Sequence, residues 1–256
     1  MLPTPFIMGP TLIENHGEIE AYTVYTSFGD VVSIDEDTYN ERITVVSQGF
    51  FEMFNFDLVD GSYGSIFENK NEAVITKTIS EKYFGTEKSA GKIISVSING
   101  VLTDLEVNAV TENVPTNSSI EYDILISDGF LQDIFGERMM TSWFMITGDT
   151  YILLEEGADP DVLVSNLPST VDAVLGEQLR ESESKYAILL QPLTEMHLDI
   201  DKTGGNTPVN DPIYLYILGA IGLLILSMAT INFTNLSLAR SLQRAREIGV
   251  RKTVGA

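Results

Sequence analysis

The residues that could bind a metal ion gather in one short stretch. In DIDKTGGNTPVN (199–210), the residues that fit positions 1, 3, 5 and 6 of an EF-hand calcium loop are Asp199, Asp201, Thr203 and Gly204. The twelfth position is Asn210, where that geometry needs a bidentate glutamate, and flanking helices are not predicted. We therefore interpret the segment as a polar linker, with a calcium loop as the weaker alternative.

Other chemically active residue types are scarce. The chain has no cysteine and two histidines, His16 and His197, and the sequence nominates no metal-binding partners for either of them. No GxSxG, HExxH or Walker A motif occurs. Trp143 and the phenylalanines at 50, 51, 54 and 56 are predicted to be core residues rather than a ligand platform. The sequence thus predicts no catalytic residue, no cofactor and no metal site.

The charge of the chain is divided unevenly between its parts. The net charge is −22, but residues 1–210 alone carry 10 basic and 35 acidic residues, a charge of −25. A body this acidic repels a nucleic-acid backbone and an anionic membrane surface. Nucleic-acid binding is therefore excluded as a function class.

One segment decides the class of the protein. The 28 residues between Asp211 and Arg240 carry no charge, and 213–231 are almost wholly apolar. At ~1.5 Å per residue, a helix of that apolar length matches the ~30 Å hydrocarbon core. We predict a transmembrane helix in 211–239, a buried helix of a soluble domain being the alternative.

The flanks of this helix predict its orientation. Basic residues follow it and acidic residues precede it, so the positive-inside rule places the C-terminus in the cytoplasm and residues 1–210 outside. The start, MLPTPFIMGP, lacks the features of a signal peptide. We therefore expect the chain to be a fragment whose earlier membrane helix begins the export.

The outer part reads as an α+β domain. Asn99-Gly100, flanked by alternating apolar residues, predicts a β-hairpin in 91–110. Asp159 and Pro160 predict the start of a helix, which Pro168 bends or divides. The elements predicted before the hairpin are two short strands around Gly29-Asp30 in 20–34, a strand end, a short helix and a turn at Asp60-Gly61 in 45–61, and a strand then a helix in 72–85. Those predicted after it are a strand in 119–127, one or two strands in 141–157 and a strand in 185–193.

The basic segment after the membrane helix carries its own pattern. Leu238, Leu242, Ala245 and Ile248 share one helical face, and Glu247 lies four residues before Arg251. A plain polybasic anchor gains about 1 kcal/mol per basic residue at an anionic leaflet. An anchor does not require the apolar stripe.

These residues carry a family resemblance. INFTNLSLARSLQRAREIGVRKTVGA (231–256) resembles the FtsX-like permeases of ABC transporters, a group that includes MacB and the lipoprotein-releasing permeases. SQGFFEMFNFDLVDGS, NEAVITKTISEKYFG, AGKIISVSING and LQPLTEMHLDI look like the MacB-type periplasmic core domain.

The resemblance implies a domain order. Residues 1–210 would be the periplasmic core domain, a porter-like subdomain with an inserted second subdomain at about 45–140. The segment 211–239 would be the second transmembrane helix of the permease, and 240–256 a short cytoplasmic helix that couples to the ATPase. The family's first helix and two later ones are absent, as expected of a chain truncated at both ends.

The resemblance also implies a function in the bacterial inner membrane. ATP would be hydrolysed on a separate ABC ATPase subunit, so this chain is not an enzyme, and helix motion would drive the periplasmic domain to export or extract a substrate (mechanotransmission). Further implied partners are a second permease copy or homologue, a periplasmic adaptor and membrane lipid. The residues implied to contact the ATPase, or to set the geometry there, are Arg244, Arg246, Glu247, Ile248, Gly249, Arg251, Lys252 and Gly255.

The substrate is not indicated by the sequence. The main alternative is a single-pass, membrane-anchored receptor or adaptor with a basic stop-transfer tail, and a minor one is a hydrolase on the outer face.

Overall fold

The computed structural model describes residues 3–34, 37–198 and 211–255. The chain divides into two compact units, residues 1–209 and 210–256, which are described separately. In chain order the elements are α1 (Met8–Asn15), β1 (Ile19–Ile34), β2 (Asp37–Val46), α2 (Phe50–Met53), β3 (Leu58–Gly61), η1 (Tyr63–Ser65), β4 (Glu72–Thr76), α3 (Lys77–Phe84), β5 (Ile93–Ile98), β6 (Val101–Thr111), β7 (Ile124–Ser127), η2 (Asp128–Phe130), α4 (Leu131–Phe135), α5 (Glu137–Thr141), β8 (Asp149–Leu154), α6 (Pro160–Glu181), η3 (Leu193–Leu198) and α7 (Ile213–Val254).

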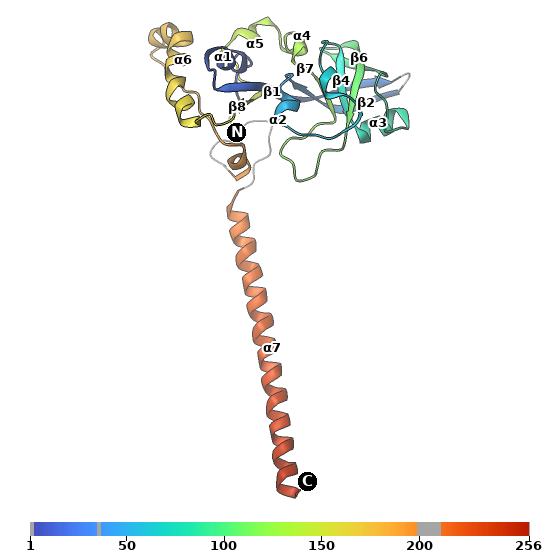
Figure 1. The fold of residues 1–256 in the computed structure, drawn as a ribbon, viewed down its shortest axis with the longest axis vertical. Helices are drawn as coiled ribbons and strands as arrows, with labels where there is room; N and C mark the ends of the chain where they lie inside the picture. The colour runs from blue at the N-terminus through green and yellow to red at the C-terminus, as the bar shows by residue number, and fades with distance from the viewer. Residues whose placement is uncertain (1–2, 35–36, 199–210, 256) are drawn as a thin grey trace. The chain divides into compact units, whose positions relative to one another are not determined.

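The first unit is built on a sheet that closes on itself. Strand pairing runs from β1 to β2, β7, β4, β6 and β5 and returns to β1, with β3 added beside β6. Figure 1 labels β1, β2, β4, β6 and β7 in this unit. Closure leaves no unpaired edge along this ring. Its inward-facing side chains form the main core and include Val32, Ile43, Ile75, Val96 and Leu105, all with no exposed surface.

Strand β1 is one long strand, so the prediction of two strands in 20–34 was wrong. Gly29 lies opposite Arg42 inside an unbroken antiparallel ladder, and its neighbour Asp30 lies opposite Glu41. The first part of β1 pairs with β8 and the last part with β2 and β5. These long-range pairings keep the chain extended through a dipeptide that resembles a turn.

The predicted hairpin is confirmed. Strands β5 and β6 are joined by Asn99 and Gly100, with φ of 52° and 80°, the positive values that a tight two-residue hairpin turn requires. The predicted strand and helix in 72–85 are also confirmed as β4 and α3, and Gly85 ends α3 with φ of 65°. The turn expected at Asp60-Gly61 is instead the end of β3.

Helix α6 begins as predicted, because the side chain of Asp159 accepts a hydrogen bond of 3.0 Å from the Asp161 N–H. Pro168 does not divide it. That residue is exposed, so water can satisfy the carbonyl it leaves unpaired, while Leu163 and Leu167 are buried in a cluster shared with α1. The cluster holds α6 together across the proline.

Two predicted strands differ from the structure. The strand expected in 185–193 is absent: residues 185–192 have no regular secondary structure and η3 follows. The strand expected in 119–127 begins only at Ile124, whereas the one or two strands expected in 141–157 are confirmed as the single strand β8. In 185–192, Ile188 is nearly buried whereas Leu189 is 67% exposed, so packing against the α1–α6 cluster takes the place of sheet pairing.

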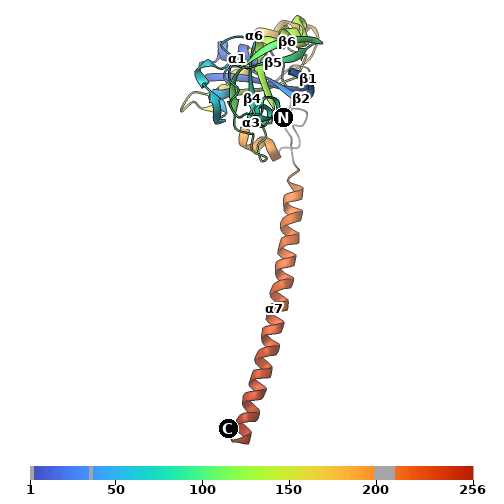
Figure 2. The same cartoon turned by 90° about the vertical axis from the view of Figure 1, so that its right-hand side faces the viewer.

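The second unit is one helix. Helix α7 runs for 42 residues and continues without a break through Ala239 and Arg240 (Figure 2). The predicted membrane segment and the predicted cytoplasmic segment are therefore parts of the same helix. It is the one helix in the described residues that is long and apolar enough to cross a membrane.

Candidate functional site

Seven of the eight predicted coupling residues lie in the last three turns of α7, and Gly255 ends the helix with φ of 82°. At about 100° per residue, Arg244, Ile248, Arg251 and Gly255 fall within a face about 60° wide. We call the face formed by these four residues the coupling face. Glu247 and Lys252 lie on either side of it. Arg246 and Gly249 lie on the opposite side, so the structure brings together six of the eight residues and not all of them.

One ion pair joins the coupling face to its flank. Glu247 Oε1 accepts a hydrogen bond of 2.8 Å from Arg251 Nη2 at an i,i+4 spacing, and both side chains are more than 60% exposed. An exposed pair of this kind stabilises a helix by only a few tenths of a kcal/mol. Its geometric effect is to fix the Arg251 guanidinium on this face, where other donors remain available.

Within the described residues, no contact requires a glycine at position 249. A Cβ built on it meets no atom within 4 Å. A glycine inside a helix is less stable than alanine by about 1 kcal/mol, so the residue weakens α7 without relieving any contact in the described structure.

Metal chemistry finds no support in the described residues. His16 is 5% exposed and its Nε2 lies 2.8 Å from the hydroxyl oxygen of Thr170, as expected of a core histidine. No group of three potential metal ligands occurs in the described residues. The calcium-loop segment 199–210 and the side chain of His197 lie outside the described part, so the linker and calcium interpretations stay predictions.

The predicted aromatic core is confirmed. Phe50 is fully buried and its ring lies 5.1–5.7 Å from those of Phe51, Phe54 and Phe56. Trp143 is 7% exposed in the α1–α6 cluster. These rings stabilise the domain and do not form an open platform.

One buried carboxyl group has a shifted acidity. Burial raises the pKa of Asp128, while hydrogen bonds from the Ser47 hydroxyl and from the Gly129 N–H oppose the shift. It is the first residue of η2, directly after β7, and its raised pKa makes the stability of this unit depend on pH.

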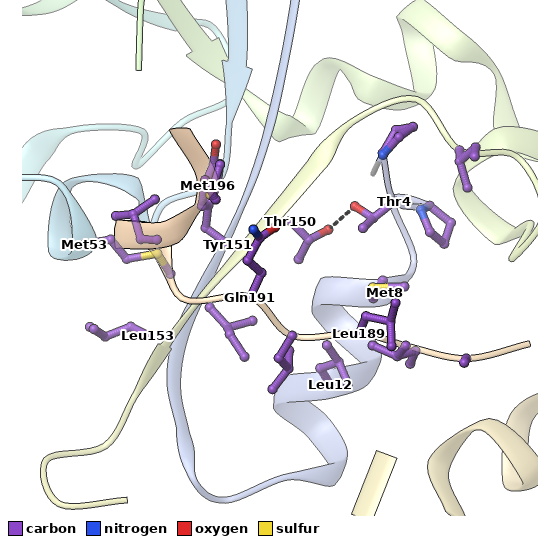
Figure 3. A pocket seen from close by; sticks show the side chains of 18 of the residues that line it. Thr4, Met8, Leu12, Met53, Thr150, Tyr151, Leu153, Leu189, Gln191 and Met196 are labelled. Atoms are coloured by element: carbon purple, nitrogen blue, oxygen red, sulfur yellow. Dashed lines mark hydrogen bonds between the residues drawn. The ribbon is translucent and has the colours of Figure 1, made fainter. Parts of the chain in front are cut away.

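A cavity that sequence reasoning missed lies in the first unit. It has a volume of about 540 Å³ and lies between α1, β8 and residues 186–196 (Figure 3). Figure 3 shows Met8 and Leu12 from α1, Leu153 from β8, and Leu189 and Met196 around it. The one available signal was the apolar run in 185–193, which was read as a strand and instead supplies a wall of the cavity.

The first unit matches one protein-family model and several solved structures. The family model of the MacB-like periplasmic core domain matches residues 6–169. A domain of a protein described as a permease from Porphyromonas gingivalis aligns with a TM-score of 0.60 and 18% identity, over 77% of this chain and 86% of that one. The periplasmic region of MacB from Actinobacillus actinomycetemcomitans aligns with a TM-score of 0.50 and 12% identity, over 73% and 86%. No curated protein sequence matches the chain.

The closed mixed sheet with its covering helices shares the fold of these domains, and the family model that matches 6–169 assigns this unit to the class of periplasmic core domains, here followed by a helix that could cross a membrane. The chain belongs to the family of MacB-like periplasmic core domains, the periplasmic part of MacB/FtsX-like ABC transporter permeases. The predicted family and fold class are confirmed. Together with α7 this indicates a bacterial inner-membrane protein.

Proposed function

We propose that this chain transmits motion within the permease subunit of a mechanotransmission-type ABC transporter. An ABC ATPase subunit contacts the C-terminal end of α7, and its ATP cycle moves the periplasmic domain to export or extract a substrate on the outer side of the membrane. The observation that carries the proposal is the continuity of α7 from its apolar span to the basic family motif.

The length of α7 supports a lever. Its 42 residues measure about 63 Å, roughly twice the ~30 Å hydrocarbon core. The uncharged residues 213–239 account for about 40 Å, close to the whole bilayer with its headgroups. The basic residues 240–254 then extend about 22 Å further, into the cytoplasm by the positive-inside rule.

The composition of the coupling end supports a partner. A polybasic anchor needs only charge, but this end also carries Gly249, which lowers helix stability and is not required by any contact in the described chain. A glycine at such a position allows another backbone to approach closely. The exposed Ile248, 66% accessible, adds an apolar group next to the arginines.

The domain boundaries belong to the same proposal. Strands β3 to β7 lie within the proposed inserted subdomain of about 45–140, and β8 then returns to the N-terminal part of β1. This return supports a porter-like subdomain made from both ends of the outer unit. A second permease copy or homologue, a periplasmic adaptor and membrane lipid are the other proposed partners.

The proposal is tested in the complete transporter with Glu247→Lys and Gly249→Trp. We expect each substitution to reduce coupled ATPase activity at least about tenfold, a loss of about 1.4 kcal/mol of docking free energy, while membrane insertion persists. Matched controls are Thr253→Lys and Thr253→Trp, which place the same groups on α7 at a residue that is not one of the eight predicted coupling residues and should leave the activity within about twofold.

Unchanged activity in both motif variants would remove the docking role. That result would favour the alternative, a membrane-anchored receptor or adaptor whose basic tail acts only as an anchor, since an anchor needs neither Glu247 nor Gly249.

A further inference from the structure

The 540 Å³ cavity follows the edge of a β-strand. Four consecutive residues of β8, Thr150 to Leu153, line it. Side chains alternate between the two faces of a sheet, so a cavity on one face would be lined by every second residue. A wall of four consecutive residues therefore means that the cavity lies along the edge of β8.

This edge already accepts a short antiparallel partner. Thr4 and Gly148 exchange backbone hydrogen bonds, with 2.6 Å from the Thr4 N–H to the Gly148 oxygen and 3.4 Å in the reverse direction. The hydroxyl groups of Thr4 and Thr150 lie 2.7 Å apart, as the dashed line in Figure 3 marks. Beyond Gly148, no strand of the described residues pairs with this side of β8.

The parity of the strand identifies the backbone groups that face the cavity. In an antiparallel ladder, alternate residues direct both their N–H and C=O to the same side. Glu155, just after β8, donates its N–H to Glu18 on the β1 side, whereas Gly148 bonds to Thr4 on the other side. The even-numbered residues Thr150 and Ile152 therefore direct their backbone groups toward the cavity.

The cavity is also uncharged, although the domain around it is strongly acidic. None of the described residues that line it carries a charge. Ile146, Leu189 and Leu193 are each more than 50% exposed at this site. Exposed apolar residues gathered beside a concave site are typical of a binding surface.

We propose that the edge of β8 and this cavity form a docking site for an extended, uncharged peptide segment of a partner polypeptide. The peptide adds as a strand to β8, bonding to the backbone of Thr150 and Ile152, and places alternate apolar side chains in the cavity. A volume of about 540 Å³ lies within the usual range of ligand pockets. This goes beyond the proposed function, which concerns the other end of the chain.

A peptide accounts for more of the site than a lipid chain does. An acyl chain would use the apolar walls but not the backbone donors and acceptors along β8, which an added strand pairs directly. A charged peptide would be opposed by the uncharged walls, because desolvating a charge without a partner is costly.

The test uses the full chain in lipid nanodiscs and a dye-labelled hexapeptide of alternating valine and threonine, followed by fluorescence anisotropy. Two further hexapeptides carry N-methyl groups on alternate residues, one at the odd and the other at the even positions. Each therefore lacks the backbone donors of one of its two edges. Fluorescent dodecanoic acid and empty nanodiscs complete the set. We expect saturable binding of the first hexapeptide, binding at least about tenfold weaker for the methylated peptide whose methyl groups face β8, and binding within about twofold for the other methylated peptide, because a strand added to β8 bonds to it along one edge only.

Two substitutions at one position separate the backbone from the side chain. Thr150→Pro removes the N–H that faces the cavity, whereas Thr150→Val keeps it, and both remove the hydroxyl bonded to Thr4. We expect about tenfold weaker binding for Thr150→Pro and a change within about twofold for Thr150→Val. If Thr150→Pro does not fold, the methylated peptides on the unchanged protein decide the question.

Several results would overturn the proposal. Equal binding of the unmethylated hexapeptide and of both methylated ones would show that the peptide does not bond to the backbone of β8. Binding of dodecanoic acid with no binding of any hexapeptide would make the site an acyl-chain site. The Leu189→Asp variant puts a charge into the cavity wall and should bind the hexapeptide more weakly. Unchanged binding in this variant would mean that the peptide binds elsewhere.

Discussion

The rotational position of the coupling face can be changed without changing its residues. We consider alanine insertions directly after Ala239, where the uncharged part of α7 ends and the basic part begins. Alanine favours the helix, so α7 is expected to stay continuous. Each added residue turns the coupling end by about 100° and lengthens the helix by about 1.5 Å.

Insertions of two and of four alanines separate the effect of rotation from the effect of length. Two alanines turn the coupling face by about 200° and lengthen α7 by about 3 Å. Four alanines lengthen it by about 6 Å but return the face to within about 40° of its original direction. If a partner reads the face that holds Arg244, Ile248 and Arg251, the shorter insertion is the more damaging one.

The size of the effect follows from the loss of the interface. Turning a face away from its partner removes at least one contact of the kind that dominates interfaces, about 2 kcal/mol or about 30-fold in affinity. The assay is binding of the purified ATPase subunit to the complete permease in nanodiscs, together with coupled ATPase activity. We expect about 30-fold weaker binding with two alanines and less than about fivefold with four.

Two binding results would contradict a role for the direction of the coupling face. Equal binding in both variants and in the unmodified protein would mean that the coupling face is not read. A loss that grows steadily with the number of alanines would mean that length matters and direction does not. Protease protection of the periplasmic domain serves as the control for insertion.

Three further predictions concern the periplasmic domain and are measured by urea unfolding of the full chain in detergent. Phe50→Ala removes a fully buried ring and should lower the free energy of unfolding by about 3–5 kcal/mol, and a loss below about 1 kcal/mol would contradict its core role. Gly61→Ala should cost about 1–3 kcal/mol, because φ is 87° and the new Cβ would lie 2.5 Å from the carbonyl oxygen of Asn108, so a neutral result would exclude this backbone geometry. For Asp128, whose pKa burial raises, the folded state binds more protons than the unfolded state between the ordinary value and the raised one. Its contribution to stability therefore falls as the pH rises through that window, and the Asp128→Asn variant should gain on the unmodified protein from acid to neutral pH.

The features that sequence predicted well are the local ones. Asn99 and Gly100 define a hairpin by their own backbone preferences, and Asp159 caps the helix that follows it. The uncharged run before Arg240 predicted the long helix from composition alone. In each case the decisive interaction lies within a few residues of the signal.

The features that sequence missed depend on contacts far along the chain. The closed ring of strands needs β1 to pair with β2, β5 and β8, and these pairings override the turn signal at Gly29. The apolar residues around Ile188 satisfy the α1–α6 cluster instead of a sheet. The cavity beside β8 depends on both facts, so the apolar run in 185–193 could not by itself predict it.

The candidate coupling residues were predicted from the family resemblance and not from local propensities. Their order along the chain came from the family resemblance, while the division into a coupling face and an opposite side came from the helix geometry. Gly249 and Arg246 lie away from Arg251, so a partner that contacts all of them must surround the helix end.

One measurement tests the central claim most directly. A photoreactive benzoylphenylalanine is placed at Ile248 on the coupling face, and a second variant carries it at Leu223 in the apolar span, in membranes of cells that make the complete transporter. After illumination, the account predicts a covalent adduct between the Ile248 variant and an ABC ATPase subunit, and none for the Leu223 variant. Adducts of the Ile248 variant with lipid alone, or with a periplasmic protein, would contradict it.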